Sequence, residues 1–71
     1  MGDTSHSVIR QIEALGYAVS VHEMPGYVEM HAVRLTSEGI SHIARCEGGG
    51  EEALYQCAVA LAEMVGIRPE V

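Results

Sequence analysis

Residues 47–66, EGGGEEALYQCAVALAEMVG, decide the fold of this 71-residue chain. Strong helix formers follow the glycines, and Gly66 stands where a left-handed C-terminal cap is expected, so we predict a helix over about 50–65. Glu51 and Glu52 would lie in its first turn, where the helix dipole stabilises carboxylates. Apolar residues recur at helical spacing and would form one stripe that the rest of the chain must cover. They are Leu54, Cys57, Ala58, Leu61 and Val65, with Ala53, Ala60 and Met64 beside them.

A second, shorter helix is predicted near the N-terminus, over about residues 5–15. Asp3, Thr4 or Ser5 can cap its start with a side-chain oxygen, and Gly16 can end it. A helix of about ten residues is too short to be stable alone in water, so it must dock its apolar stripe on another element. That stripe consists of Val8, Ile9, Ile12 and Leu15.

After Gly16 the period of the sequence changes from about 3.6 to 2, which predicts strands. We expect three strands, over about 17–23, 27–35 and 40–46. Pro25-Gly26 separates the first two, and the polar segment 36–39 separates the second from the third, because proline and glycine both favour turns. The predicted order is therefore helix, strand, strand, strand, helix.

The two turns also predict a register. A two-residue turn at Pro25-Gly26 would place Val21 opposite Met30, and a bulged turn before the third strand would place Ala32 opposite Ala44. A one-residue slip at either turn would reverse the faces of a whole strand. In the expected register one face is apolar, and both helices can pack on it, so we predict a single α+β domain over 1–71, a two-layer α-β-β-β-α sandwich. That face would carry Val19, Val21, Val28, Met30, Ala32, Ile40, Ala44 and Cys46.

Charge excludes several functions. The chain has ten acidic residues and four arginines, for a net charge of −6. This charge repels phosphate backbones and anionic lipid surfaces, and duplex binding needs a clustered basic face, so we expect neither a nucleic-acid partner nor a membrane partner. With two cysteines, no signal-like segment and no long apolar run, we predict a cytoplasmic protein with reduced thiols; the alternative is a bridge between Cys46 and Cys57.

Glu52 and Ala53 begin the last helix and the small pair Cys57-Ala58 follows, a pattern that resembles the second helix of double-stranded-RNA-binding domains. That family has the same predicted order of elements, so the resemblance implies its fold. Its RNA-contacting lysines correspond to glycine, acid and leucine in residues 49–54, which speaks against RNA binding. A degenerate nucleic-acid module is the alternative function. The glycine-rich turn, acid pair and alanine-rich helix are also similar to small phage-type α/β/α sandwich proteins.

Histidines are the candidate metal ligands. His22 and His31 are expected on the uncovered face of the sheet with Glu29, whereas His42 would point towards the helices unless a register slip brings it to the same side. Three such ligands on one face could hold zinc or another divalent ion. None of the spacings is a metal motif, however. We therefore predict no metal and no cofactor, with His22, His31 and His42 as the only candidates.

The sequence supports a phosphate-binding or catalytic site less than it supports a metal site. Gly48-Gly49-Gly50 before a helix could cradle a phosphate, but Glu51-Glu52 already occupies the positive end of the helix dipole. Either cysteine with His42 could form a thiolate pair, yet both cysteines are expected to face the apolar side of the fold. We predict that the protein is not an enzyme.

The uncovered face of the sheet remains as the predicted functional surface. Aliphatic side chains beside polar ones on so small a domain suggest a protein partner or a homodimer. We therefore expect a non-enzymatic accessory domain that acts through protein–protein contacts or self-association. The expected surface consists of Tyr27, His31, Val33, Leu35, Ile43 and Arg45.

Overall fold

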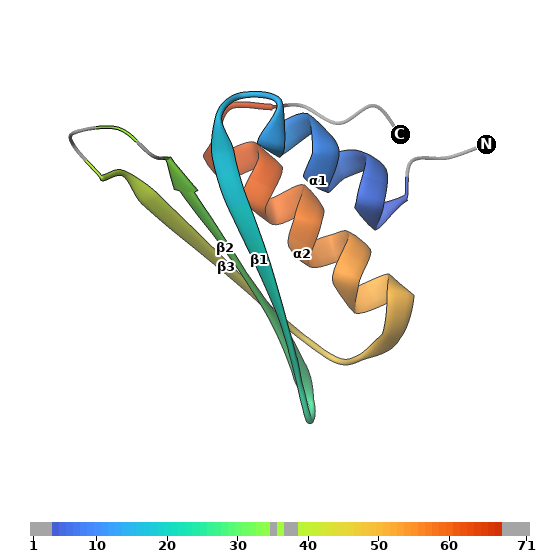
Figure 1. Cartoon of the computed structure of the whole chain (residues 1–71). Coiled ribbons are helices and arrows are strands. Elements are labelled where there is room, and N and C mark those ends of the chain that lie inside the picture. The colour runs from blue at the N-terminus through green and yellow to red at the C-terminus, as the bar shows by residue number, and fades with distance from the viewer. Residues whose placement is uncertain (1–3, 35, 37–38, 68–71) are drawn as a thin grey trace.

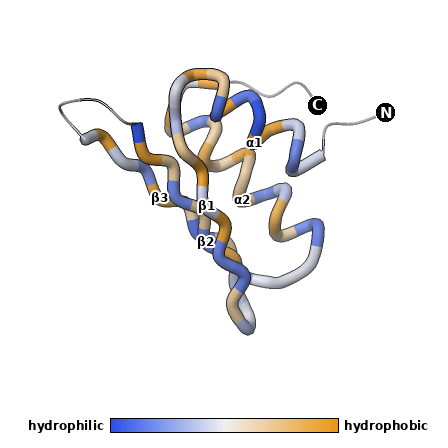
Figure 2. The backbone as a smooth tube through the Cα atoms, viewed as in Figure 1, coloured by the Kyte–Doolittle hydropathy of each residue, from blue (hydrophilic) through white to orange (hydrophobic). Residues whose placement is uncertain are grey.

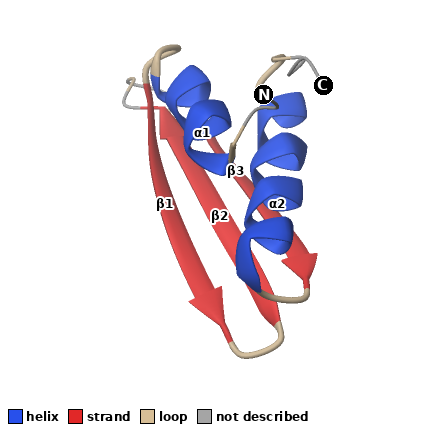
Figure 3. Cartoon of the chain, turned by 90° about the vertical axis from the view of Figure 1, so that its right-hand side faces the viewer, coloured by secondary structure: helices blue, strands red, loops and turns tan. Residues whose placement is uncertain are grey.

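The structure is a computed structural model that describes residues 4–34, 36 and 39–67. Three strands form one antiparallel sheet in the order β1-β2-β3, and both helices lie on the same face of it (Figures 1 and 3). The predicted fold class, an α+β two-layer sandwich, is confirmed. In chain order the elements are α1 (Ser5–Glu13), β1 (Tyr17–Met24), β2 (Tyr27–Arg34), β3 (Ser41–Glu47) and α2 (Gly50–Met64).

The first hairpin has the predicted register. Val21 lies opposite Met30, and Met24 pairs with Tyr27 across the turn. Gly26 has a φ of +87°, a left-handed conformation that a residue with a Cβ adopts only with strain. The Pro25-Gly26 sequence therefore sets both the position of the turn and the faces of β1 and β2.

The predicted register of the second hairpin is wrong by two residues. Ala44 lies opposite Met30 and not opposite Ala32. The cause is the turn, because the N–H of Arg34 donates to the carbonyl of Ile40 at 2.8 Å and so centres the pairing one residue earlier than expected. When the centre of the hairpin moves by one residue, the β3 residue opposite each β2 residue changes by two. Because side chains alternate between the two faces with a period of two, every side chain stays on its predicted face.

Helix α1 is shorter than predicted. It begins after Thr4, whose Oγ1 accepts a hydrogen bond from the N–H of Ser7 at 3.1 Å, so the expected side-chain cap is present. It ends at Glu13, and Leu15, predicted as part of its stripe, lies outside the helix and is exposed.

Helix α2 ends as predicted, at a glycine cap. Gly66 has a φ of +92°, and the N–H of Ile67 donates to the carbonyl of Ala62 at 2.8 Å, the pattern of a Schellman cap. The predicted stripe needs two corrections, because Ala62 is buried and Met64 at the end of the helix is exposed. Helix α1 packs against α2 as well as against the sheet, so the buried arc of α2 is wider than one stripe.

The core lies between the two layers and is aliphatic. Helix α2 packs across β2 and β3, while α1 packs on β1 and on α2. Many of the buried residues are alanines, which let the helices lie close to the sheet. The buried apolar residues are Val8, Ile12, Val28, Met30, Ala32, Ala44, Ala53, Cys57, Ala58, Leu61 and Ala62.

Helix α1 covers only part of β1. Val21 points to the helix side of the sheet, as predicted, but it remains 40% exposed. Figure 3 shows why, since α1 lies over one end of the sheet and the tip of the β1-β2 hairpin extends well beyond it. Ile40, also predicted on the covered face, lies just before β3 begins and is 40% exposed.

Replacing Ile12 by alanine tests this packing. We expect Ile12→Ala to lower the free energy of unfolding by about 2–4 kcal/mol, because it leaves a cavity in a fully buried site. Leu15→Ala, a change of the same size at an exposed position, should cost less than about 1 kcal/mol. Urea denaturation of both variants measures the difference, and equal losses would contradict the described end of α1.

Candidate functional site

The uncovered side of the sheet is a surface made by alternate residues of all three strands, which we call the open face. Hydropathy changes along each strand in Figure 2, as expected where one side is buried and the other exposed. The pairing places four residues of each strand on this side. They are Ala18, Ser20, His22 and Met24 of β1, Tyr27, Glu29, His31 and Val33 of β2, and Ser41, Ile43, Arg45 and Glu47 of β3.

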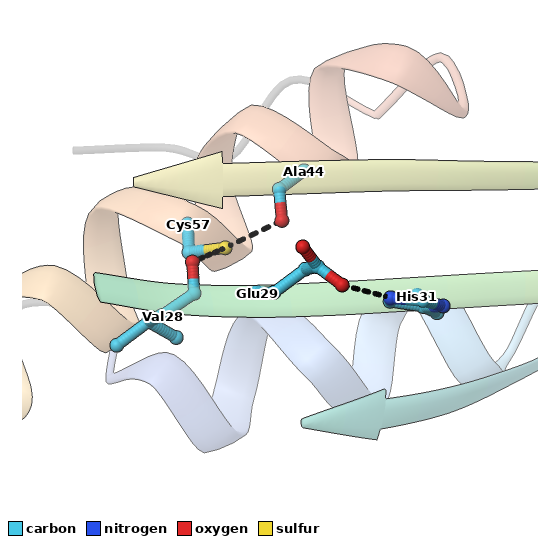
Figure 4. A network of polar contacts seen from close by, with 5 residues as sticks. All are labelled: Val28, Glu29, His31, Ala44 and Cys57. Carbon is cyan, nitrogen blue, oxygen red and sulfur yellow. Dashed lines mark hydrogen bonds and ion pairs between the residues drawn. The ribbon is translucent and has the colours of Figure 1, made fainter. Parts of the chain in front are cut away.

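Polar side chains at the middle of the open face bind one another. Glu29 lies between His22 on β1 and Arg45 on β3. Nε2 of His31 donates to Oε1 of Glu29 at 2.7 Å (Figure 4), and the rings of His22 and His31 are 5.1 Å apart. The hydrogen bond from His31 is the main cause that lowers the pKa of the Glu29 carboxyl below its ordinary value. Glu29 is therefore held as a carboxylate inside a cationic and imidazole environment.

Arg45 is held over an aromatic ring. Its guanidinium carbon lies 4.0 Å from the centre of the Tyr27 ring, within the range of a cation–π interaction. Glu29 lies opposite Arg45 and Glu47 lies opposite Tyr27, so acids on two strands stand beside the stacked pair. The one ion pair among the described residues of the open face is that between His31 and Glu29.

Apolar side chains surround this polar centre and remain exposed. Ile43 is 54% exposed, Met24 is 47% exposed and Val33 is 37% exposed. Ile43 lies opposite His31, while Met24 and Val33 lie at opposite ends of the sheet. Five of the six residues expected to form the interaction surface therefore share this face, and the sixth, Leu35, lies outside the described residues.

The three candidate metal ligands do not come together. His42 lies opposite Ala32 on the helix side of the sheet, and its ring packs against the edge of Tyr17 with centres 5.9 Å apart. Only His22 and His31 share a face, and His31 is already bonded to Glu29. Over the ranges 4–34 and 39–67, no three His, Cys, Asp or Glu side chains are placed to hold one ion.

The two cysteines are Cys46, which is partly exposed, and Cys57, which does not have the surroundings of a nucleophile. Both are free thiols, so the Cys46–Cys57 bridge considered from the sequence is not formed. Sγ of Cys57 is fully buried and lies 3.2 Å from the carbonyl oxygen of Ala44 and 3.7 Å from that of Val28 (Figure 4). Burial is the main cause that raises the pKa of the Cys57 thiol to about 11, which keeps it protonated at neutral pH.

The start of α2 is occupied by its own acids. Oγ of Ser5 donates to Oε1 of Glu51 at 2.7 Å, which ties the start of α1 to the first turn of α2. A shallow hollow of about 180 Å³ beside this turn is lined by Glu47 and Glu52 together with Gly48 and neighbouring residues. Two carboxylates at its wall make it unsuited to phosphate.

A larger, shallow hollow of about 680 Å³ follows the outer surface of α1. The described residues that line it belong to α1 or to its two caps, and no described residue of another element lines it. Without a second wall it can enclose no ligand. Its lining consists of Thr4, His6, Ser7, Arg10, Gln11 and Ala14.

No family model, curated protein or solved structure matches the chain. Within the described part of the chain, neither helix has the length and apolar character needed to cross a membrane.

Three contacts of the structure were not predicted from the sequence. Glu29 was expected on the open face, but its bond to His31 and the contact between His22 and His31 depend on how side chains lean across the strands. The Ser5–Glu51 bond joins residues 46 positions apart and has no local signal. The capping pattern near Ser5 predicted only the start of the helix.

The buried thiol makes stability depend on alkaline pH. In the unfolded chain Cys57 ionises near its ordinary pKa of 9.0, whereas in the folded chain it stays protonated until about pH 11. The unfolded state therefore loses its proton first, and stability should fall between these two values by about 2 kcal/mol. Denaturation of the wild type and of Cys57→Ala at pH 8.5 and pH 10.5 measures this loss of stability. Equal losses in both proteins would show that Cys57 does not contribute it.

Proposed function

We propose that this chain is a small non-catalytic domain that acts through protein contacts, and that its open face binds a second copy of the same chain. The observation that supports this most strongly is the difference between the two sides of the sheet. One side is covered by two helices except near Val21 and Ile40, while the other leaves Met24, Val33 and Ile43 in solvent. On this face exposed apolar groups stand beside polar ones, and exposed apolar groups that share one face are typical of surfaces that associate with proteins.

Charge favours a second copy as the occupant. The chain carries a net charge of −6, so two copies repel each other over most of their surfaces. On the open face the only acids are Glu29 and Glu47, and Arg45 stands beside them with two histidines nearby. Repulsion between two copies is therefore weaker across this face than the net charge of the whole chain implies.

The size of the face makes the expected dimer weak. Three strands of seven or eight residues span roughly 14 by 26 Å at ordinary strand spacing. A contact of this extent falls at the low end of specific protein interfaces. We therefore expect reversible association that depends on protein concentration.

The alternative, a degenerate nucleic-acid-binding module, has less support from the geometry. In the RNA-binding family that the element order resembles, the start of the second helix carries the phosphate-contacting lysines. Here Glu51 and Glu52 stand in that turn, and Glu47 lies beside it. Acids at this position repel a phosphate backbone.

Ile43→Asp tests the open face. A buried, unpaired carboxylate should raise the dimer dissociation constant by about tenfold or more. Ile40→Asp is the matched control, because Ile40 is also an exposed isoleucine and lies outside the open face. Sedimentation equilibrium up to millimolar concentration measures both variants and the wild type. A monomeric wild type, or equal effects of the two changes, would contradict the proposal.

A further inference from the structure

Strand β1 is an edge strand, and no described residue pairs with the backbone groups along its outer side. In β2, Arg34 donates to Ile40 and Gly26 accepts from Gly48, so the even-numbered residues of β2 bond to β3 and the odd-numbered ones bond to β1. The partners of those odd-numbered residues are the even-numbered residues of β1. The N–H and C=O groups of Tyr17, Val19, Val21 and Glu23 therefore point away from the sheet.

This edge has few of the features that prevent strands from pairing. Its pairing with β2 runs without interruption from Tyr17 to Met24, so it contains no bulge, and it contains no proline or lysine. Glu23 is its only charged residue. Folded proteins protect an edge with such features when it must stay single. An unprotected edge of eight residues is a surface for another strand.

We propose that two copies of this chain pair antiparallel through their β1 strands, about a two-fold axis at Ser20, to form a continuous six-stranded sheet. In this register Val19 of one copy lies opposite Val21 of the other, and Tyr17 lies opposite Glu23. All four outward-pointing residues of each copy then find backbone partners. A register shifted by two residues in either direction leaves one outward-pointing residue of each copy without a backbone partner.

Charge complementarity selects a second copy as the occupant of this edge. One end of β1 carries Glu23, and at the other end the guanidinium of Arg34 lies 5.7 Å from the centre of the Tyr17 ring. An antiparallel pair brings the acid of each copy beside the tyrosine of the other, on the same side of the sheet as Arg34. The pairing also covers the half-exposed Val21 with Val19 of the second copy, and cross-strand pairs of β-branched residues are favourable.

This edge contact goes beyond the open-face contact and does not need it. Ser20 lies on the open face, so pairing at the edge joins the two open faces into one surface and leaves both uncovered. The edge contact is made by the backbone of Tyr17, Val19, Val21 and Glu23, whereas the open-face contact buries the side chains of Met24, Val33 and Ile43. Each can therefore fail without the other.

Ser20→Cys tests the proposed axis. Residues opposite each other at a position without hydrogen bonds have Cα atoms about 4.5 Å apart, within the range that a disulfide can bridge. Ala18→Cys is the matched control on the same face, because its two copies would lie about 13 Å apart in this register. Both changes are made in a Cys46→Ala background. Under mild oxidation we expect about tenfold more covalent dimer from Ser20→Cys than from Ala18→Cys, and equal yields would overturn the proposal.

Two further changes separate the edge from the open face. Val21→Pro removes an outward N–H without touching the bonds between β1 and β2, so it should abolish the Ser20→Cys dimer, whereas Val21→Ala should preserve it. Circular dichroism checks that both variants fold. Ile43→Asp should leave the Ser20→Cys dimer intact. Edge pairing would be overturned if the Ser20→Cys dimer survived in Val21→Pro, or if it were lost in Ile43→Asp. If Ile43→Asp associates like the wild type, only the open-face proposal is overturned.

Discussion

The packing of α2 across β2 and β3 is the constraint on which the rest of the structure depends. Small side chains such as Ala53, Ala58 and Ala44 let the helix lie close to the sheet, and the buried thiol of Cys57 bonds to the backbone of both strands it crosses. Because α2 occupies β2 and β3, the shorter α1 is left to cover β1 and does so only in part. The exposure of Val21 follows from this division.

Most of the fold could be predicted because period and turn chemistry act locally. The Pro25-Gly26 turn set the first hairpin, and the glycine at Gly66 set the end of α2. The second hairpin was displaced because its register depends on which backbone groups bond across the turn, and either arrangement satisfies the same faces. Leu15 and Met64 were placed in the core because a helical stripe does not show where the partner layer ends.

The candidate site could be predicted only as a set of residues that share a face. Alternation along the strands placed Tyr27, His31, Val33, Ile43 and Arg45 together, and it also separated His42 from the other candidate ligands. Contacts within the site depend on side-chain direction across strands, which alternation does not describe. The chain is acidic overall, and its open face combines two acids, one arginine and exposed apolar side chains. This combination is the physical basis of the proposed association.

The central claim is that both helices lie on one side of the sheet and leave the other side to solvent. Nuclear Overhauser contacts in a labelled sample at low concentration test it most directly. We expect contacts from the Cys57 side chain to Ala44 and Val28, which its sulfur approaches at 3.2 Å and 3.7 Å, and none from either helix to the Ile43 methyl groups. Contacts between Ile43 and a helix of the same molecule would contradict the account.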